Sequence, residues 1–143
     1  MCGIAGMMST SAVPDAARVE AMSAALGHRG PDGTGSYFRD NVALAHRRLA
    51  IIDLKTGDQP ITEGGGPTIV ANAEIYNYLE LRQSLIQQGK KFSTFSDTEV
   101  LLKLLIQYGE EGLCQLNGMF AFVFHDREKN EWLAARDPFG IKP

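Results

Sequence analysis

Short apolar runs alternate with amphipathic stretches along this chain and predict strands and helices of similar length. Residues 119–124 are apolar at every position, which is typical of a strand covered on both faces. Three other segments have helical spacing, and each ends near a glycine. The predicted strands cover residues 4–8, 36–39, 42–46, 68–71, 119–124 and 131–136, and the predicted helices cover 14–26, 78–88, 100–108 and a short turn through Leu113 and Leu116.

The order of these elements favours an α+β fold. Strands arrive as hairpins and helices as pairs, rather than as strand–helix–strand units. The length of 143 residues is that of one domain, which can bury roughly 68% of its unfolded surface. Residues 28–35 contain three glycines and a proline and predict a loop. Residues 96–99 fit a capping box at the start of a helix.

Composition narrows the classes of partner and location. Hydrophobic content of 44% with 22% charged residues indicates a folded chain, and a net charge of −3 gives no reason to expect nucleic acid. No apolar run approaches the ~20 residues of a membrane span, and residues 1–13 lack the basic start of a signal peptide. Cys2 and Cys114 are too few and too distant for a metal site. We expect a cytoplasmic protein without a metal, with Cys114 buried in a short apolar helix.

Candidate chemistry lies at the start of the chain, Met1-Cys2-Gly3-Ile4-Ala5-Gly6. If Met1 is removed, Cys2 carries a thiol and a free α-amine whose ordinary pKa is about 7.7–8.0. Such an amine can act as a base beside the thiol, because the thiolate is the effective nucleophile. An internal cysteine lacks this pair, since a peptide nitrogen is not a base. These residues leave two interpretations open, a nucleophile or merely the second residue of a strand.

Seven motifs in order resemble one family and favour the nucleophile. They are Met1–Gly6, His28–Asp32, Ala45–Leu49, Glu74–Asn77, Ser96–Glu99, Gly118–Phe122 and Arg136–Pro143. Together they resemble the N-terminal glutaminase domain of class II glutamine amidotransferases, in the branch of the glutamine-hydrolysing asparagine synthetases. The resemblance covers the whole chain. It implies the N-terminal nucleophile hydrolase fold, a four-layer αββα sandwich of two antiparallel sheets, over residues 1–143 and truncated before its last strands.

The resemblance also implies the roles of the reacting groups. Cys2 would attack the side-chain amide of L-glutamine and form a thioester, with its α-amine shuttling the proton. The side chain of Asn72 and the backbone N–H of Ala73 would stabilise the oxyanion. The family has Gly at position 73, so Ala73 would cost roughly 1–2 kcal/mol if that position needs a positive φ.

Charged residues are implied for the amino-acid end of the substrate. Arg48 would hold the α-carboxylate, and Glu74 and Asp97 would receive the α-ammonium. Other residues expected nearby are Leu49, Ile51 and Ile52 along the pocket, and Arg29 and Asp32 around the N-terminus. Simpler interpretations stay open from the residues alone: a turn for Asn72, helix-start electrostatics for Asp97, loop rigidity for Arg29 and Asp32, and a surface ion pair, more readily formed by Arg47 than by Arg48.

The implied partners are L-glutamine and a synthetase domain or subunit that receives ammonia, most simply for making asparagine from aspartate. No cofactor is expected in this domain, whereas ATP and Mg²⁺ belong to the synthetase, and a homodimer is left open.

Two alternative functions remain. The chain could be an impaired glutamine-binding or partner-binding module, disabled by Ala73 or by missing strands, or a glutaminase serving a sugar-phosphate acceptor. The residues 28–32 and 48–49 favour the asparagine synthetase branch.

Overall fold

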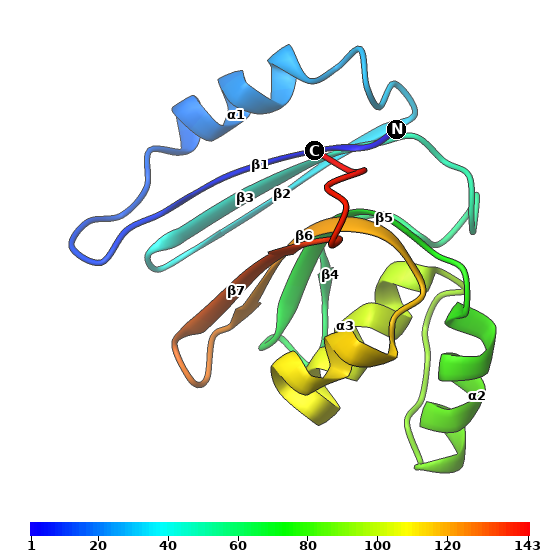
Figure 1. Cartoon of the computed structure of the whole chain (residues 1–143). Coiled ribbons are helices and arrows are strands. Elements are labelled where there is room, and N and C mark those ends of the chain that lie inside the picture. The colour runs from blue at the N-terminus through cyan, green and yellow to red at the C-terminus, as the bar shows by residue number, and fades with distance from the viewer.

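Two sheets lie face to face, and helices cover their outer sides. The computed structural model describes all 143 residues. Figure 1 shows α1 on the first sheet, and α2 and α3 on the far side of the second. The elements are β1 (Gly3–Met8), α1 (Ala16–Ala25), β2 (Gly33–Arg39), β3 (Val42–Arg48), β4 (Ile61–Thr62), β5 (Thr68–Ile75), α2 (Tyr78–Gln87), α3 (Asp97–Tyr108), the 3₁₀-helix η1 (Gly109–Gln115), β6 (Gly118–Asp126) and β7 (Glu131–Arg136). The predicted α+β class and αββα layers are confirmed.

The first sheet is antiparallel, with the order β1-β3-β2. Its hairpin turns at Asp40-Asn41 as predicted, and Asp40 adopts a φ of +50° there. Alternate side chains of β3 face opposite sides of the sheet. Ala43 therefore packs against Val19 of α1, whereas Leu44 faces the second sheet.

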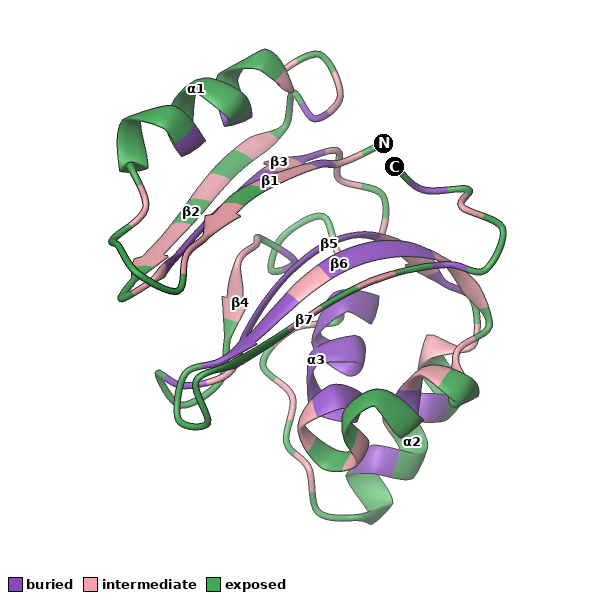
Figure 2. Ribbon diagram, turned by 60° about the vertical axis from the view of Figure 1, so that its left-hand side comes forward, coloured by how far each residue is buried: buried purple, intermediate pink, exposed green.

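The second sheet has the order β4-β5-β6-β7, and its central strands are covered on both faces. β6 presents Phe120, Phe122 and Phe124 to the helices and Val123 to the first sheet. Figure 2 shows how burial continues along this strand. The doubly covered strand predicted over 119–124 is confirmed within β6.

Helix α3 is buried on almost all sides, whereas the sequence predicts an amphipathic helix. Every residue of Asp97–Leu105 is buried, because the helix lies between the second sheet and α2 (Figure 2). The predicted capping box forms only in part. Ser96 Oγ accepts from the Thr98 N–H at 3.0 Å, but the Glu99 carboxylate accepts from the Ser93 N–H at 2.8 Å.

Three apolar side chains predicted to be buried, those of Ala17, Met22 and Cys114, are exposed. Of the predicted apolar face of α1, Val19 alone is buried, and Met22 is 42% exposed, because the helix lies on a sheet of only three strands. Cys114 is exposed on η1, so the prediction of a buried thiol is wrong. The tighter winding of a 3₁₀-helix turns it away from the core. None of the helices has the length and apolar character required to cross a bilayer.

Candidate active site

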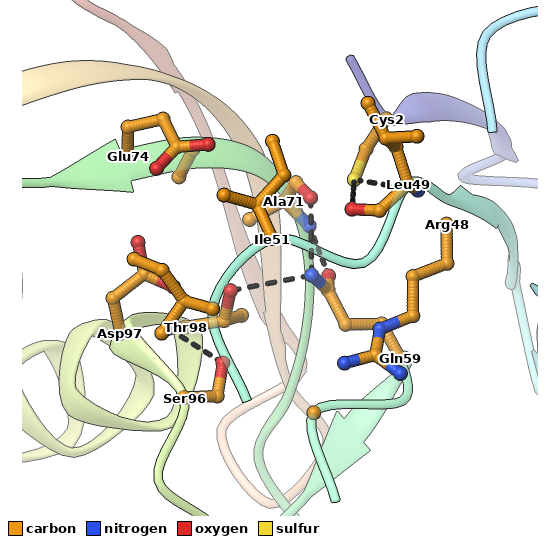
Figure 3. A pocket seen from close by; sticks show the side chains of 13 residues that line it. Cys2, Arg48, Leu49, Ile51, Gln59, Ala71, Glu74, Ser96, Asp97 and Thr98 are labelled. Carbon is orange, nitrogen blue, oxygen red and sulfur yellow. Dashed lines mark hydrogen bonds between the residues drawn. The ribbon is translucent and has the colours of Figure 1, made fainter. Parts of the chain in front are cut away.

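A pocket lies between the N-terminus, the segment after β3, the free edge of β5 and the start of α3. These distant parts of the sequence meet because β1 pairs with β3 and α3 packs on β5. The lining consists of Cys2, Arg48, Leu49, Ile51, Ile52, Gly57, Gln59, Ala71, Ala73, Glu74, Ser96, Asp97 and Thr98. It contains every residue predicted to contact the substrate except Asn72, which lies between two lining residues of β5. Figure 3 shows this arrangement.

Cys2 directly precedes β1, and its thiol lies against the peptide of Leu49. The Sγ atom accepts a hydrogen bond from the Leu49 N–H at 3.4 Å and donates to the Leu49 carbonyl at 3.6 Å (Figure 3). The antiparallel pairing of Gly3 with Arg47 produces this contact, since it brings the residues beyond the pair together. Met1 is 48% exposed, so its removal would leave the core intact.

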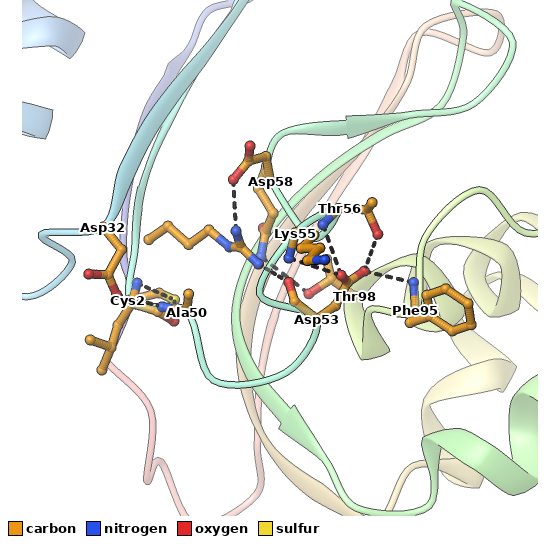
Figure 4. Close-up of polar contacts among 12 residues, drawn as sticks. Cys2, Asp32, Ala50, Asp53, Lys55, Thr56, Asp58, Phe95 and Thr98 are labelled. Atoms are coloured by element: carbon orange, nitrogen blue, oxygen red, sulfur yellow. Dashed lines mark hydrogen bonds and ion pairs between the residues drawn. The ribbon is translucent and has the colours of Figure 1, made fainter.

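Arg48 ends β3, and two groups hold its guanidinium. Nη1 donates to Asp58 Oδ1 at 2.9 Å, and Nη2 donates to the Asp53 carbonyl (Figure 4). A Cβ at Gly57 would lie 2.8 Å from Nη2, so a larger residue there would displace the guanidinium. The side chain is 9% exposed. Its other N–H groups have no partner in the protein and suit a planar carboxylate.

Arg47 points to the opposite side of the sheet. Its Nε donates to the Ser23 carbonyl of α1 at 3.0 Å. Strand alternation separates the two arginines, so that one faces the helix and the other faces the pocket. The surface ion pair predicted for Arg47 is therefore wrong, and it is Arg48 that pairs with a carboxylate.

Two carboxylates, Asp97 and Glu74, lie on the opposite side of the pocket from the guanidinium (Figure 3). Asp97 is 5% exposed, and its Oδ2 accepts from the Ile75 N–H at 3.0 Å. Burial raises the pKa of Asp97 above its ordinary value; the hydrogen bond from Ile75 opposes this rise, and the nearby charge of Glu74 reinforces it. A cation placed between these carboxylates would relieve their repulsion.

The free edge of β5 presents one backbone donor to the pocket. β4 pairs with only the first two residues of β5, so the rest of this edge has no strand beside it. Alternate N–H groups face this edge. That of Ala71 donates to Gln59 Oε1 at 2.6 Å, and that of Ile75 donates to Asp97 Oδ2. The N–H of Ala73 lies between them without a partner.

Asn72 and Ala73 lie within β5, whereas the sequence predicts that they follow its strand. Asn72 is 2% exposed, and its Nδ2 is buried without a hydrogen-bond partner. Like Val70, two residues earlier, it faces the first sheet, which carries Cys2. Ala73 is not among the residues with positive φ, and its methyl packs against the helix-side core. The backbone strain expected at position 73 is therefore absent.

The glutamine amidotransferase domain family matches residues 1–143 of this chain. The chain belongs to this family. It is 42% identical over 148 residues to asparagine synthetase [glutamine-hydrolyzing] 1 of Bacillus subtilis, covering 100% of this chain and 23% of that protein. It is 43% identical over 146 residues to asparagine synthetase [glutamine-hydrolyzing] 2 of Oryza sativa subsp. japonica, covering 100% of this chain and 24% of that protein.

A solved structure supports the fold of this glutamine amidotransferase domain. The glutamine phosphoribosylpyrophosphate amidotransferase of B. subtilis, in complex with ADP and GMP, matches with a TM-score of 0.59 and 30% identity. The match covers 74% of this chain and 25% of that one. The N-terminal nucleophile hydrolase arrangement expected from the sequence is confirmed by this likeness. The chain thus spans about a quarter of the length of the proteins that it matches.

Arg29 and Asp32 of the amidotransferase domain hold the segments that carry the pocket. Arg29 Nε donates to the Cys2 carbonyl at 3.1 Å. Asp32 Oδ2 accepts from the Ala50 N–H at 2.9 Å, which fixes the segment after β3 (Figure 4). Neither side chain lines the pocket. Both contacts stiffen the backbone around the thiol.

Asp53 and Gln59 also build the site, although the sequence does not predict a role for either. Asp53 adopts a φ of +53°, and its carboxylate accepts from the N–H groups of Thr56 at 2.8 Å and Phe95 at 2.7 Å (Figure 4). An aspartate that accepts from residues two and three positions later is a known turn signal, so the local part of this contact was readable. The contact of Gln59 with β5 has no such signal, because its partner lies 12 residues away.

His46 is buried between the sheets. Its Nε2 donates to the Ala71 carbonyl at 3.2 Å, and its Nδ1 has no partner. Burial lowers the pKa of His46 to about 4, although the bond to Ala71 opposes this. The ring is therefore neutral at pH 7 and joins the two sheets. No three His, Cys, Asp or Glu side chains come together as metal ligands would.

Proposed function

We propose that this domain hydrolyses L-glutamine to glutamate and ammonia through a thioester on Cys2. One observation carries the proposal: the Cys2 thiol shares a pocket with the Arg48 guanidinium, the Asp97 carboxylate and the unpartnered N–H of Ala73. A free amino acid offers the complementary groups, namely an α-carboxylate, an α-ammonium and a side-chain carbonyl. Membership of the amidotransferase family makes the amide of glutamine the group that is attacked.

The reaction begins after Met1 is removed. The α-amine of Cys2 takes the thiol proton, and the thiolate attacks the amide carbon of glutamine. The C–N bond breaks, and the amine passes the proton to the departing ammonia. Water then attacks the thioester, which releases glutamate and restores the thiol. The position of Sγ beside the Leu49 peptide keeps the nucleophile at the edge of the pocket.

The oxyanion of each tetrahedral intermediate would accept hydrogen bonds from Asn72 Nδ2 and from the N–H of Ala73. Asn72 Nδ2 has no partner, and the Ala73 N–H faces the part of the β5 edge that β4 does not pair with, so no existing bond must break when charge develops. Such preorganised donors are worth about 10²–10³ in rate each. Asn72 lies just behind the pocket lining, between the lining residues Ala71 and Ala73 of β5.

The amino-acid end of glutamine would bind between Arg48 and the two carboxylates. Arg48, held by Asp58 and Asp53, would donate its remaining N–H groups to the α-carboxylate. Asp97 and Glu74 receive the α-ammonium. The remaining contacts come from the backbone of Leu49, Ile51 and Ile52.

The ammonia would pass to a synthetase domain or subunit that makes asparagine from aspartate. Relatives named asparagine synthetases support this acceptor, since they match the whole chain at 42–43% identity. The chain covers only 23–24% of these relatives, and ATP and Mg²⁺ would bind in the remaining part. A phosphoribosyl acceptor is the second candidate, because the solved amidotransferase shares the fold. The proposal includes a cytoplasmic location and does not include a homodimer.

Ammonia release from glutamine by the Met1-processed chain tests the proposal. A glutamine-like electrophile should add once, at Cys2, and block the release, as intact mass and peptide mapping will measure. Cys114→Ser serves as the control and should label and turn over normally, since Cys114 is exposed and remote. Labelling at Cys114, or full turnover with Met1 retained, would contradict the thioester mechanism.

Ala73→Gly separates an active domain from an impaired binding module. Because the backbone at Ala73 is unstrained, we expect the rate of ammonia release to change by less than about 3-fold, with a loss of about 0.5–1 kcal/mol in the free energy of unfolding. Ammonia assays and urea denaturation measure the two effects. If the wild-type chain is inactive and the variant active, the module interpretation holds instead.

A further inference from the structure

Gln59 caps the free edge of β5 at the pocket. Its side-chain amide pairs with Ala71 as a neighbouring strand would: Oε1 accepts from the Ala71 N–H at 2.6 Å, and Nε2 donates to the Ala71 carbonyl at 3.2 Å (Figure 3). These partners fix which way the amide points, because a backbone N–H only donates and a carbonyl only accepts. Strand-like pairing along this edge of β5 therefore continues from β4 as far as Ala71. The next N–H group on the same edge, that of Ala73, is not paired.

The same amide reaches across to α3. Its Nε2 also donates to Thr98 Oγ1 at 3.2 Å. Thr98 follows Asp97 in the first turn of the helix. Gln59 thus joins the strand that carries the Ala73 donor to the helix that carries the Asp97 carboxylate, and it does so inside the pocket.

The backbone of Gln59 is fixed against the first sheet. A Cβ at Gly35 of β2 would lie 2.0 Å from the Gln59 carbonyl oxygen, so only glycine permits this approach. β2 begins at Gly33, inside the segment predicted as a loop, because it pairs with β3 from Arg48 onward. The side chain therefore extends from a rigid base toward β5.

We propose that Gln59 is a positioning residue that holds the Ala73 N–H where the oxyanion forms. The inference rests on the proposed function, and Gln59 itself touches no reacting atom. Without the cap, the bond from His46 to the Ala71 carbonyl would be the only side-chain hydrogen bond left on Ala71, and the Ala71 N–H would compete for the same charge. Since a displacement of about 1 Å can cost about 10²-fold in rate, we expect the loss in kcat rather than in KM.

Gln59→Met removes all three hydrogen bonds at nearly constant length. In ammonia assays of the Met1-processed chain, kcat should fall about 10–100-fold and KM should change by less than about 3-fold. Thr98→Val removes only the link to α3 and should give a smaller fall in kcat. Gln83→Met on the exposed face of α2 is the matched control and should leave both constants unchanged.

Alkylation of Cys2 by iodoacetamide distinguishes positioning from general loosening. This reaction forms no oxyanion, so in a Cys114→Ser background its rate should stay at the wild-type value in Gln59→Met. Loss of the three bonds should lower Tm by about 6–12 °C. An unchanged kcat, a change confined to KM, a parallel fall in alkylation and turnover, or unfolding of Gln59→Met with normal kcat in Thr98→Val would each overturn the proposal. If the wild-type chain releases no ammonia, the proposed function fails instead.

Discussion

At the residue scale, the buried position of Asp97 is unfavourable for an ionised carboxylate. Its carboxylate is buried beside Glu74, and burial together with that charge raises its pKa. The folded state therefore binds this proton more tightly than the unfolded chain does. The stability that Asp97 contributes is greatest below its ordinary pKa of about 4 and falls as the pH rises through the raised value. We expect a ligand cation to stabilise the ionised form of a carboxyl group in this position.

Asp97→Asn should separate binding from stability. We expect KM for glutamine to rise about 10–150-fold, the loss of one hydrogen bond to a charged group, because the amide cannot neutralise the α-ammonium. Tm at pH 7 should be unchanged or higher, since the amide oxygen can still accept from the Ile75 N–H. Steady-state ammonia assays and thermal denaturation measure the two quantities.

Asp15→Asn is the matched control, because Asp15 is the exposed N-cap of α1 and lies away from the pocket. It should leave KM unaltered. A fall in Tm for Asp97→Asn with a normal KM would mean that the role of Asp97 is purely structural. In the wild-type chain, glutamine binding should weaken as the pH falls through the pKa of Asp97, because protonation removes the negative charge.

At the scale of elements, the pocket depends on close approaches between segments that carry little secondary structure of their own. The segment between β3 and β4 is held at Asp53, which binds the guanidinium of Arg48 and the start of α3. It is held again at Gln59, which packs on Gly35 of β2. Gln59 connects the two sheets, whereas Asp53 connects the first sheet to the segment before α3. The site therefore responds to changes in β2, which contributes no residue to its lining.

Gly35→Ala should disturb the site from a distance. The new methyl would lie 2.0 Å from the Gln59 carbonyl oxygen, so the segment must shift. We expect a loss of about 1–3 kcal/mol in the free energy of unfolding, measured by urea denaturation, and a fall in kcat for ammonia release. Gly66→Ala is the control, because the nearest atom lies at 3.6 Å and the change should stay within about 0.5 kcal/mol. Equal effects of the two substitutions would contradict the close-approach argument.

For the whole molecule, the contact between the sheets makes the free energy of unfolding depend on pH. His46 of the first sheet donates to Ala71 of the second, and burial lowers its pKa from 6.5 to about 4. Between these pH values the unfolded chain binds a proton that the folded chain does not. Stability is therefore complete above about pH 6.5 and is lost progressively toward pH 4. Burial also lowers the pKa of His125, which acts in the same direction.

His46→Gln should flatten this pH dependence. A pKa difference from 6.5 to about 4 corresponds to about 3 kcal/mol in the free energy of unfolding, at 1.36 kcal/mol per pH unit. The glutamine amide does not titrate, so the variant loses this pH-dependent contribution, but it can still donate to the Ala71 carbonyl. Urea midpoints between pH 4 and 7 measure the slope. His28→Gln, on the exposed surface, should keep the wild-type slope. A slope that survives in His46→Gln would assign acid sensitivity to other groups.

Local sequence patterns determined most of the helices and strands, but not how far each of them is buried. The apolar run in β6, the hairpin at Asp40 and the helix stop at Gly89, which adopts a φ of +85°, depend on neighbours in sequence and were predicted correctly. Burial of α3 and exposure of Cys114 depend on which layers lie beside them, and both were predicted wrongly. Periodicity reports that a face is apolar, but not how many faces the fold covers.

The sequence by itself determined the chemical groups of the site, because motif residues such as Cys2, Arg48 and Asp97 carry their chemistry wherever they lie. Tertiary structure alone decided which backbone groups remain free. The N–H of Ala73 is left free because β4 is too short to pair with it, and because Gln59 and Asp97 bind the neighbouring donors of Ala71 and Ile75 instead. No local signal encodes that outcome, since a hydrogen-bond donor becomes available only where the fold leaves it without a partner.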